Sequence, residues 1–139
     1  MSAFENATRF FHACESAAGW DQCEPFVEPD ASFSAQCEPL VDIKTLKDYV
    51  IGTERFNTIL APDSSYELHC SSYDEKSRKA MFFGTFTGTH TGEGASIPPT
   101  GKQTKTDYVY VMEMSKNGKV QSMQKIWNAN WSMKEIGWM

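Results

Sequence analysis

The chain has 139 residues, which predicts a single domain over 1–139 that buries roughly two-thirds of the surface exposed by its unfolded form. Apolar residues make up 40% and charged residues 22%, so ordinary globular usage disfavours a disordered or collagen-like chain. The net charge is −5 without a cluster of Lys and Arg, which disfavours binding to nucleic acid. No run of 18 apolar residues occurs, so neither a membrane span nor a secretory leader is expected.

The four cysteines also restrict the chemistry. Cys14, Cys23, Cys37 and Cys70 form no C-x-x-C pair, and no His lies at metal-finger spacing from any of them. We therefore expect no metal. Without a leader the expected location is the reducing cytoplasm, where such cysteines act as small buried apolar residues.

The first half of the chain has the period of helices. Ser2 and Glu5 form a capping box, and apolar residues then recur at helical spacing until Gly19, which predicts a helix between these points. The other elements expected in this half are a short helix over 20–26, a strand over 31–36, and a helix over 43–60 with Asp42 as its N-cap.

From Ser64 onward the apolar period changes from helical spacing to alternation, which is typical of strands. Strands are predicted over residues 66–73, 80–91, 103–114 and 120–128, and a last helical turn over 131–138. Asn117-Gly118 is a strong hairpin signal between the last two strands. Helices followed by antiparallel strands predict an α+β domain whose helices pack on one face of a curved sheet.

Glycines recur inside the predicted strand 80–91. Gly84 and Gly88 are interpreted as points where the sheet bends or bulges. A sheet curled around helices forms a cone with an internal cavity, which suits a small molecule. The alternative is that these glycines only accommodate a neighbouring backbone.

Several short motifs carry a family resemblance. The sequence G-T-H-T-G-E over 88–93 precedes I-P-P-T-G-K over 97–102, and Gly118-Lys119-Val120 and Ile126-Trp127-Asn128 follow. In this order and spacing they resemble the SnoaL-like polyketide (ester) cyclases of the nuclear-transport-factor-like superfamily. The resemblance implies a cone-shaped curved antiparallel sheet wrapped around N-terminal helices with an internal pocket. It further implies a homodimer formed through the sheet and no metal or organic cofactor.

The resemblance also implies the chemistry. Members with known activity close a ring in a polyketide ester by an aldol step, with a carboxylate directly after the last-strand Trp as general acid/base. Here that position holds Asn128, which can orient or polarise a carbonyl but cannot relay a proton. His90, beside the glycine-rich bend, is the second predicted catalytic residue, and the loop 92–101 after it could act as a lid.

Strand alternation extends the candidate site. If Asn128 faces the pocket, every second residue before it in the last strand does so too. The resemblance gives the inward face of the preceding strand, and the long helix and first strand close the roof. The predicted substrate-binding residues are Gln124, Ile126, Tyr108, Tyr110, Met112, Tyr49 and Phe33. The alternative is a filled core in which the Tyr hydroxyls reach backbone groups.

The opposite face of the last two strands is also partly apolar, so a partner subunit is expected to cover it. Together these features predict a protein that binds or converts a hydrophobic, carbonyl-rich small molecule without a cofactor. The predicted reaction class is proton transfer next to a carbonyl, leading to cyclisation, isomerisation or dehydration. The alternative function is a non-catalytic ligand-binding or dimerisation module on the same fold.

Overall fold

The computed structural model describes residues 2–139, which form helices packed on a five-stranded sheet. The helices are α1 (Ala3–Glu15), α2 (Trp20–Cys23), α3 (Leu46–Arg55) and α4 (Ala129–Ile136), with a 3₁₀ turn η1 (Glu24–Phe26) after α2 and a π-helical turn η2 (Phe56–Leu60) after α3. The strands are β1 (Val27–Ala35), β2 (Ser65–Asp74), β3 (Lys79–Thr89), β4 (Gln103–Met114) and β5 (Val120–Trp127).

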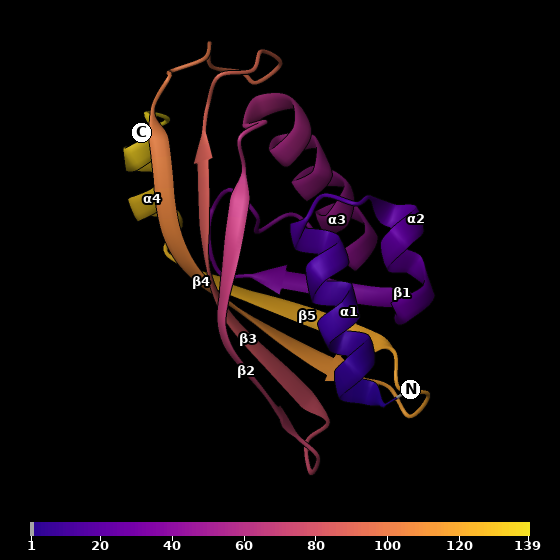
Figure 1. Cartoon of the computed structure of the whole chain (residues 1–139). Coiled ribbons are helices and arrows are strands. Elements are labelled where there is room, and N and C mark those ends of the chain that lie inside the picture. Colours follow the sequence, from indigo (N-terminus) through magenta and orange to yellow (C-terminus); the bar gives the residue numbers. More distant parts are fainter. Residues whose placement is uncertain (1) are drawn as a thin grey trace.

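The sheet has the strand order β1-β5-β4-β3-β2. All neighbouring strands run antiparallel except β1, which lies parallel to β5 at one edge. The strands β2, β3 and β4 are long and strongly bent, and α1, α2 and α3 lie within the curve (Figure 1). The predicted α+β fold, a curved sheet around N-terminal helices, is confirmed.

The predicted capping box opens α1, since the Ser2 hydroxyl accepts a hydrogen bond from the Glu5 backbone N–H at 3.1 Å. The helix ends at Glu15 and not near Gly19, because Ala17 adopts a left-handed backbone with φ of 58°. Gly19 instead precedes α2 as its N-cap, with φ of 94°. The early end of α1 places Glu15 at the tip of the helix.

The third predicted helix, 43–60, is shorter at its start. Thr45 caps α3 in place of Asp42, because the segment before it is held in an extended form. The Lys44 carbonyl there accepts a hydrogen bond from the Phe33 N–H at 2.8 Å, which joins it to β1. The last turn of the helix widens into η2, and such π-helical turns often accompany functional sites.

The bend at Gly84 has two structural reasons. The register of β2 with β3 shifts between Leu68 and Cys70, where β2 carries an extra residue, and Gly84 is the partner of Leu68. A Cβ added to Gly84 would lie 2.9 Å from a β2 carbonyl oxygen and 3.1 Å from the Tyr108 hydroxyl. The position therefore combines the predicted bulge with the close approach considered as its alternative.

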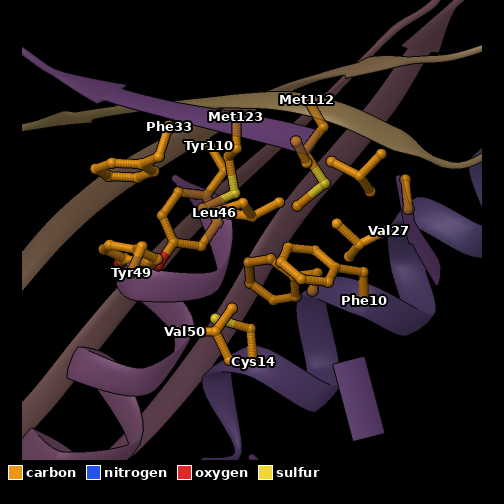
Figure 2. Close-up of a cluster of buried hydrophobic side chains, with 14 of the residues drawn as sticks. Phe10, Cys14, Val27, Phe33, Leu46, Tyr49, Val50, Tyr110, Met112 and Met123 are labelled. Atoms are coloured by element: carbon orange, nitrogen blue, oxygen red, sulfur yellow. The ribbon is translucent and has the colours of Figure 1, made fainter. Parts of the chain in front are cut away.

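Buried rings and thioethers fill the space between α1, α3 and the sheet (Figure 2). Phe11 of α1 stacks on Phe82 of β3, with ring centroids 4.9 Å apart. Phe33 and Met112, which were predicted to bind substrate, are buried members of this core. The strand face predicted for Met112 is correct, but the apolar stripes of the two helices cover that end of the sheet completely.

Two of the cysteines, Cys14 and Cys23, are buried as expected, whereas Cys37 is half-buried and Cys70 is exposed. In the part of the chain that the structure describes, no helix has the length and apolar character needed to cross a membrane.

Candidate functional site

A cavity of about 420 Å³ lies beside the core, between the concave face of the sheet and the helices. Ligand sites for small molecules commonly have volumes of roughly 300–1,000 Å³. Every second residue of β4 from Thr104 to Tyr110 faces it, and β5 adds Lys125 and Trp127. The predicted internal pocket is therefore present.

The helices complete the wall. The tip of α1 contributes Glu15, and α3 contributes Tyr49. The π-helical turn η2 presents Phe56, Asn57 and Leu60. The C-terminal segment closes the far side with residues from α4 and with Trp138.

Five side chains form a polar cluster in the cavity wall: Glu15, Tyr49, Tyr108, Tyr110 and Lys125. The hydroxyls of Tyr49 and Tyr110 share a hydrogen bond, and the Tyr110 hydroxyl points toward Tyr49 (Figure 2). Lys125 Nζ donates to the Tyr49 hydroxyl at 3.1 Å. The same Nζ lies 4.3 Å from the centroid of the Trp127 ring, at cation–π distance.

Two atoms of the polar cluster lack a partner. Among residues 2–139, neither Glu15 Oε1 nor the Tyr108 hydroxyl has a hydrogen-bond partner, although the side chains are only 7% and 3% exposed. Leaving a buried polar group unpaired costs about 1–3 kcal/mol. Because both atoms belong to the cavity wall, a polar group of a bound molecule is the natural partner for them.

Burial sets the protonation of this cluster. It raises the pKa of the Glu15 carboxyl above its usual 4.5, and the Tyr110 hydroxyl, the Lys125 ammonium and the Tyr108 hydroxyl oppose the rise only in part. Burial likewise lowers the pKa of the Lys125 amine, with the Glu15 carboxylate as the main opposing influence. It raises the pKa of Tyr108 and Tyr110, which therefore remain hydrogen-bond donors.

This arrangement supports acid/base chemistry. A carboxyl with a raised pKa can accept and return a proton nearer neutrality than an exposed one. The phenol O–H groups can donate to an oxygen on which negative charge develops. Within residues 2–139, no cluster of three or more His, Cys, Asp or Glu side chains is placed to hold a metal ion.

The sequence matches the model of the SnoaL-like polyketide cyclase family over residues 5–136, nearly the whole chain. The chain belongs to the SnoaL-like polyketide cyclase family. The resemblance drawn from the short motifs is thereby confirmed. No curated protein sequence matches the chain significantly.

Solved structures agree with this family at the level of the fold. A candidate SnoaL-like polyketide cyclase from Jannaschia sp. CCS1 superposes with a TM-score of 0.78 at 15% identity, over 96% of this chain and 90% of that one. IdmH of Streptomyces antibioticus, a candidate polyketide cyclase, gives 0.74 at 14% identity over 99% of both chains. An NTF2-like protein from Burkholderia thailandensis gives 0.75 at 12% identity over 97% of both. At these identities the likeness shows the nuclear-transport-factor-like fold alone.

The cavity brings together only part of the predicted site. Tyr49, Tyr108 and Tyr110 line it. The inward face predicted for β5 is wrong, because Gln124 and Ile126 lie on the outer face of the sheet and are exposed. The family resemblance had fixed the parity of this strand through Asn128, so one misplaced residue reversed the whole strand.

Asn128 follows β5 and does not line the cavity. Its Oδ1 accepts a hydrogen bond from the Trp131 N–H at 3.1 Å, so the side chain caps α4 and is exposed. Trp127 is the residue that points inward, and its Nε1 donates to the Thr106 hydroxyl at 2.9 Å. An inward Trp127 requires that its two neighbours in the chain point away.

His90 is buried behind the cavity wall. Its Nδ1 accepts a hydrogen bond from Trp138 Nε1 at 2.9 Å, and Trp138 separates it from the cavity. Backbone hydrogen bonds from His90 N–H to Lys102 and from Gly101 N–H to His90 join the two ends of the loop 91–100. The structure therefore gives His90 a place in the base of the loop, one residue away from the cavity.

Sequence reasoning missed Glu15 and Lys125. Glu15 follows Phe11 by four residues and so continues the apolar stripe of α1, where a carboxylate is out of place. Lys125 alternates with Met123 and Trp127, a pattern that would have placed all three on one buried face. In both cases the available signal was one charged residue at a position where the periodic pattern of the element predicts an apolar residue.

Proposed function

We propose that this protein converts a hydrophobic, carbonyl-rich small molecule by moving a proton at the carbon next to a carbonyl, with its own side chains as acid and base. The observation that carries the proposal is the buried Glu15 carboxyl in one cavity with the Tyr108 hydroxyl, since neither Glu15 Oε1 nor that hydroxyl has a hydrogen-bond partner among residues 2–139. The family and the candidate polyketide cyclases among its structural neighbours support a polyketide as the substrate class.

The proposed reaction begins with Glu15 as the base. Its carboxylate removes the C–H proton, and the electron pair moves to the carbonyl oxygen as an enolate. The Tyr108 O–H donates a hydrogen bond to that oxygen, where negative charge develops in the transition state. The enolate carbon then attacks a second carbonyl of the same molecule, and the protonated Glu15 returns its proton to the new alkoxide. Ring closure by an aldol step results.

The substrate-contacting residues of this proposal are Tyr49, Tyr108 and Tyr110, with Glu15 as the acid/base. Asn128 and His90, the two predicted catalytic residues, enter it only as supports, the first through α4 and the second through Trp138. An Asn128→Asp variant should therefore not gain cyclase activity, since its new carboxylate would lie outside the cavity.

Proton abstraction can be tested without the natural substrate. We expect the protein to accelerate exchange of the acidic C–H protons of 2-tetralone, an aromatic-fused ketone, in deuterated buffer, followed by NMR. Glu15→Gln should lower the rate by about 100-fold, the usual contribution of a general base. Glu38→Gln, a change of an exposed carboxylate outside the cavity, is the matched control. Binding of the ketone without any exchange would support the non-catalytic alternative.

We also propose that a second copy of the chain covers the outer face of the sheet. Phe83, Val109 and Ile126 lie in one row across β3, β4 and β5, and Phe83 and Ile126 are 37% and 54% exposed. A two-fold dimer would bury the same row from both copies. Sedimentation equilibrium should give twice the chain mass, and Ile126→Lys should halve it. Asn130→Lys, on the exposed side of α4, should leave the mass unchanged.

The proposed location is the cytoplasm, where the accessible thiols of Cys37 and Cys70 would remain reduced. Cell fractionation of the producing organism tests this directly, and recovery from an extracellular fraction would contradict it.

A further inference from the structure

We infer that Lys125 is a nucleophile that forms an imine with the carbonyl group of an aldehyde or ketone bound in the cavity. This inference rests on the proposed function, because it takes the same cavity and the same class of ligand. It goes further by making part of the chemistry covalent and by assigning the attacking atom.

The Lys125 amine is surrounded by aromatic rings in the cavity wall. Lys125 Nζ lies in the cavity wall beneath four aromatic rings, with centroid distances of 4.3 Å to Trp127, 5.4 Å to Tyr49, 5.5 Å to Tyr108 and 5.9 Å to Tyr110. An ammonium has three N–H donors. Among residues 2–139, the Tyr49 hydroxyl is the one hydrogen-bond acceptor that Nζ reaches.

Lys125 forms no salt bridge with the residues that the structure describes. Within the described residues no carboxylate lies at ion-pair distance from Lys125. Lys125 is half-buried, and a structural lysine in such a position is normally paired with an anion, because desolvating an isolated charge is costly. Burial also lowers the pKa of this amine, which increases the fraction of the uncharged, nucleophilic form.

The neighbouring Glu15 completes the arrangement. Its carboxyl is more than nine-tenths buried, and Oε1 has no hydrogen-bond partner among residues 2–139. Imine formation needs a group that first gives a proton to the carbonyl oxygen and later receives one from the nitrogen. A carboxyl with a raised pKa in the same cavity can do both.

Imine formation proceeds through a carbinolamine. The Nζ lone pair attacks the carbonyl carbon, a C–N bond forms, and the C–O π electrons move to the oxygen, which takes a proton from the Glu15 carboxyl. The nitrogen of this carbinolamine returns one proton to the Glu15 carboxylate. The hydroxyl leaves as water after protonation by Glu15, and the product is the iminium of Lys125. The amine, the carbonyl and the Glu15 carboxyl thus give the iminium, water and the Glu15 carboxylate. The iminium acidifies the adjacent C–H more strongly than the parent carbonyl does.

Reductive trapping tests this on the unmodified protein. Benzaldehyde and sodium cyanoborohydride are added, and an imine is thereby fixed as a stable benzyl amine detected by intact mass and peptide mapping. We expect Lys125 to be labelled about tenfold faster than Lys134, an exposed lysine of α4 that serves as internal reference. Labelling of Lys125 no faster than Lys134 would overturn the inference.

Variants provide the second measurement. Lys125→Arg keeps the positive charge but cannot form an imine, whereas Lys134→Arg is its matched control at the surface. We expect Lys125→Arg to lower the 2-tetralone exchange rate by about 100-fold and Lys134→Arg to leave it unchanged. An unchanged rate in Lys125→Arg would overturn a role of the imine in turnover. Thermal unfolding checks that each variant is folded, and if Lys125→Arg does not fold, the labelling ratio in the unmodified protein still decides.

The two proposals fail separately. If Glu15→Gln abolishes exchange but Lys125 is neither labelled preferentially nor required, proton transfer by Glu15 stands and the covalent step falls. If Lys125 is labelled preferentially but the protein accelerates no exchange, the amine is nucleophilic and the proposed function falls.

Discussion

Polar groups on the outer face of the bent sheet hydrogen-bond to one another, whereas polar groups that face the cavity do not all have partners. On the outer face, His69 Nε2 and the Thr85 hydroxyl lie 2.7 Å apart, the Thr85 hydroxyl donates to Asp107 at 2.6 Å, and His69 Nδ1 lies 3.3 Å from Glu67. On the inner face, Tyr108 of β4 and Glu15 of α1, which packs over that face, retain atoms without a partner among residues 2–139.

This difference distinguishes polar groups that stabilise the fold from polar groups that are available to a ligand. The outer groups satisfy one another, so they need nothing more from a ligand. The inner groups remain unsatisfied although they are more deeply buried, and such an arrangement is costly unless a ligand completes it. The position of polar residues in the sheet is therefore less informative than whether their hydrogen bonds are made.

The largest expected effect is on the exchange rate, in a comparison of two variants that each remove one hydroxyl, one from each face of the sheet. Tyr108→Phe removes the unpartnered inner hydroxyl, and Thr85→Val removes the partnered outer one, on neighbouring strands. We expect Tyr108→Phe to slow 2-tetralone exchange by about 100-fold, as loss of one oxyanion donor does, and Thr85→Val to leave it unchanged. Equal losses in the NMR exchange assay would contradict the distinction between the faces.

The second prediction tests the space that the inner face requires. Gly84→Ala would place a methyl group against Tyr108 and a β2 carbonyl, so we expect the free energy of unfolding to fall by about 1–3 kcal/mol. Gly52→Ala is the control, because a Cβ at that position of α3 would meet no atom of the described residues 2–139 within 4 Å. It should raise the free energy of unfolding by about 1 kcal/mol through helix propensity. Urea titration measures both.

The third prediction concerns the stability of the same two variants, for which we expect the order of effects to be the opposite of that on activity. Thr85→Val breaks two hydrogen bonds and should lower the free energy of unfolding by about 1 kcal/mol. Tyr108→Phe breaks no hydrogen bond of standard geometry within the described residues and removes only the weaker interaction of its hydroxyl with the Glu15 carboxyl, so stability should change less than in Thr85→Val. Urea unfolding of the two variants at one pH is sufficient. A larger loss in Tyr108→Phe would show that its hydroxyl has a structural partner.

The smallest effect is the pH dependence of stability. The folded Glu15 carboxyl has a pKa above its usual 4.5, so the folded state binds more protons than the unfolded chain between these values. Its contribution to stability is therefore greatest below pH 4.5 and is lost as the pH rises through the raised value. The free energy of unfolding of the unmodified protein, minus that of Glu15→Gln, should fall over this range.

Asp63 serves as a control, because its contribution to the free energy of unfolding should change with pH in the opposite direction. Hydrogen bonds from the Thr89 side chain and backbone lower the pKa of Asp63 below its usual 3.8. Its stabilisation is present above pH 3.8 and is lost as the pH falls through the lowered value. The same difference measured with Asp63→Asn should therefore rise with pH, and slopes of one sign for both variants would contradict the assignment.

The sequence predicted the fold more fully than the site. Local signals were sufficient for most elements, as the capping box of α1 and the Asn117-Gly118 hairpin show. The cavity depends on where α1 ends, and that end is set by the left-handed Ala17, which has no strong sequence signature. Glu15 could therefore not be placed in the cavity from its period alone.

The site prediction failed where it depended on a single anchor. The inward face of β4, which the family resemblance supplied, is correct, because Tyr108 and Tyr110 line the cavity. On β5 the alternation was counted from Asn128, which lies beyond the last paired residue of the strand and belongs to the cap of α4. Counting from Lys125, a charge flanked by apolar alternate positions, would have given the correct face.

Gly92 lies where the loop after β3 crosses η2. A Cβ there would lie 1.6 Å from the Ile59 carbonyl oxygen, and the N–H groups of Thr91 and Gly92 both donate to Leu60. No side chain larger than hydrogen can occupy this crossing while the backbones stay in place. Further along, Arg55 holds the Gly94 carbonyl at 2.6 Å, and Thr100 donates to the Ile136 carbonyl at 2.6 Å. The five residues from 95 to 99 are therefore the stretch of the loop between these anchoring contacts.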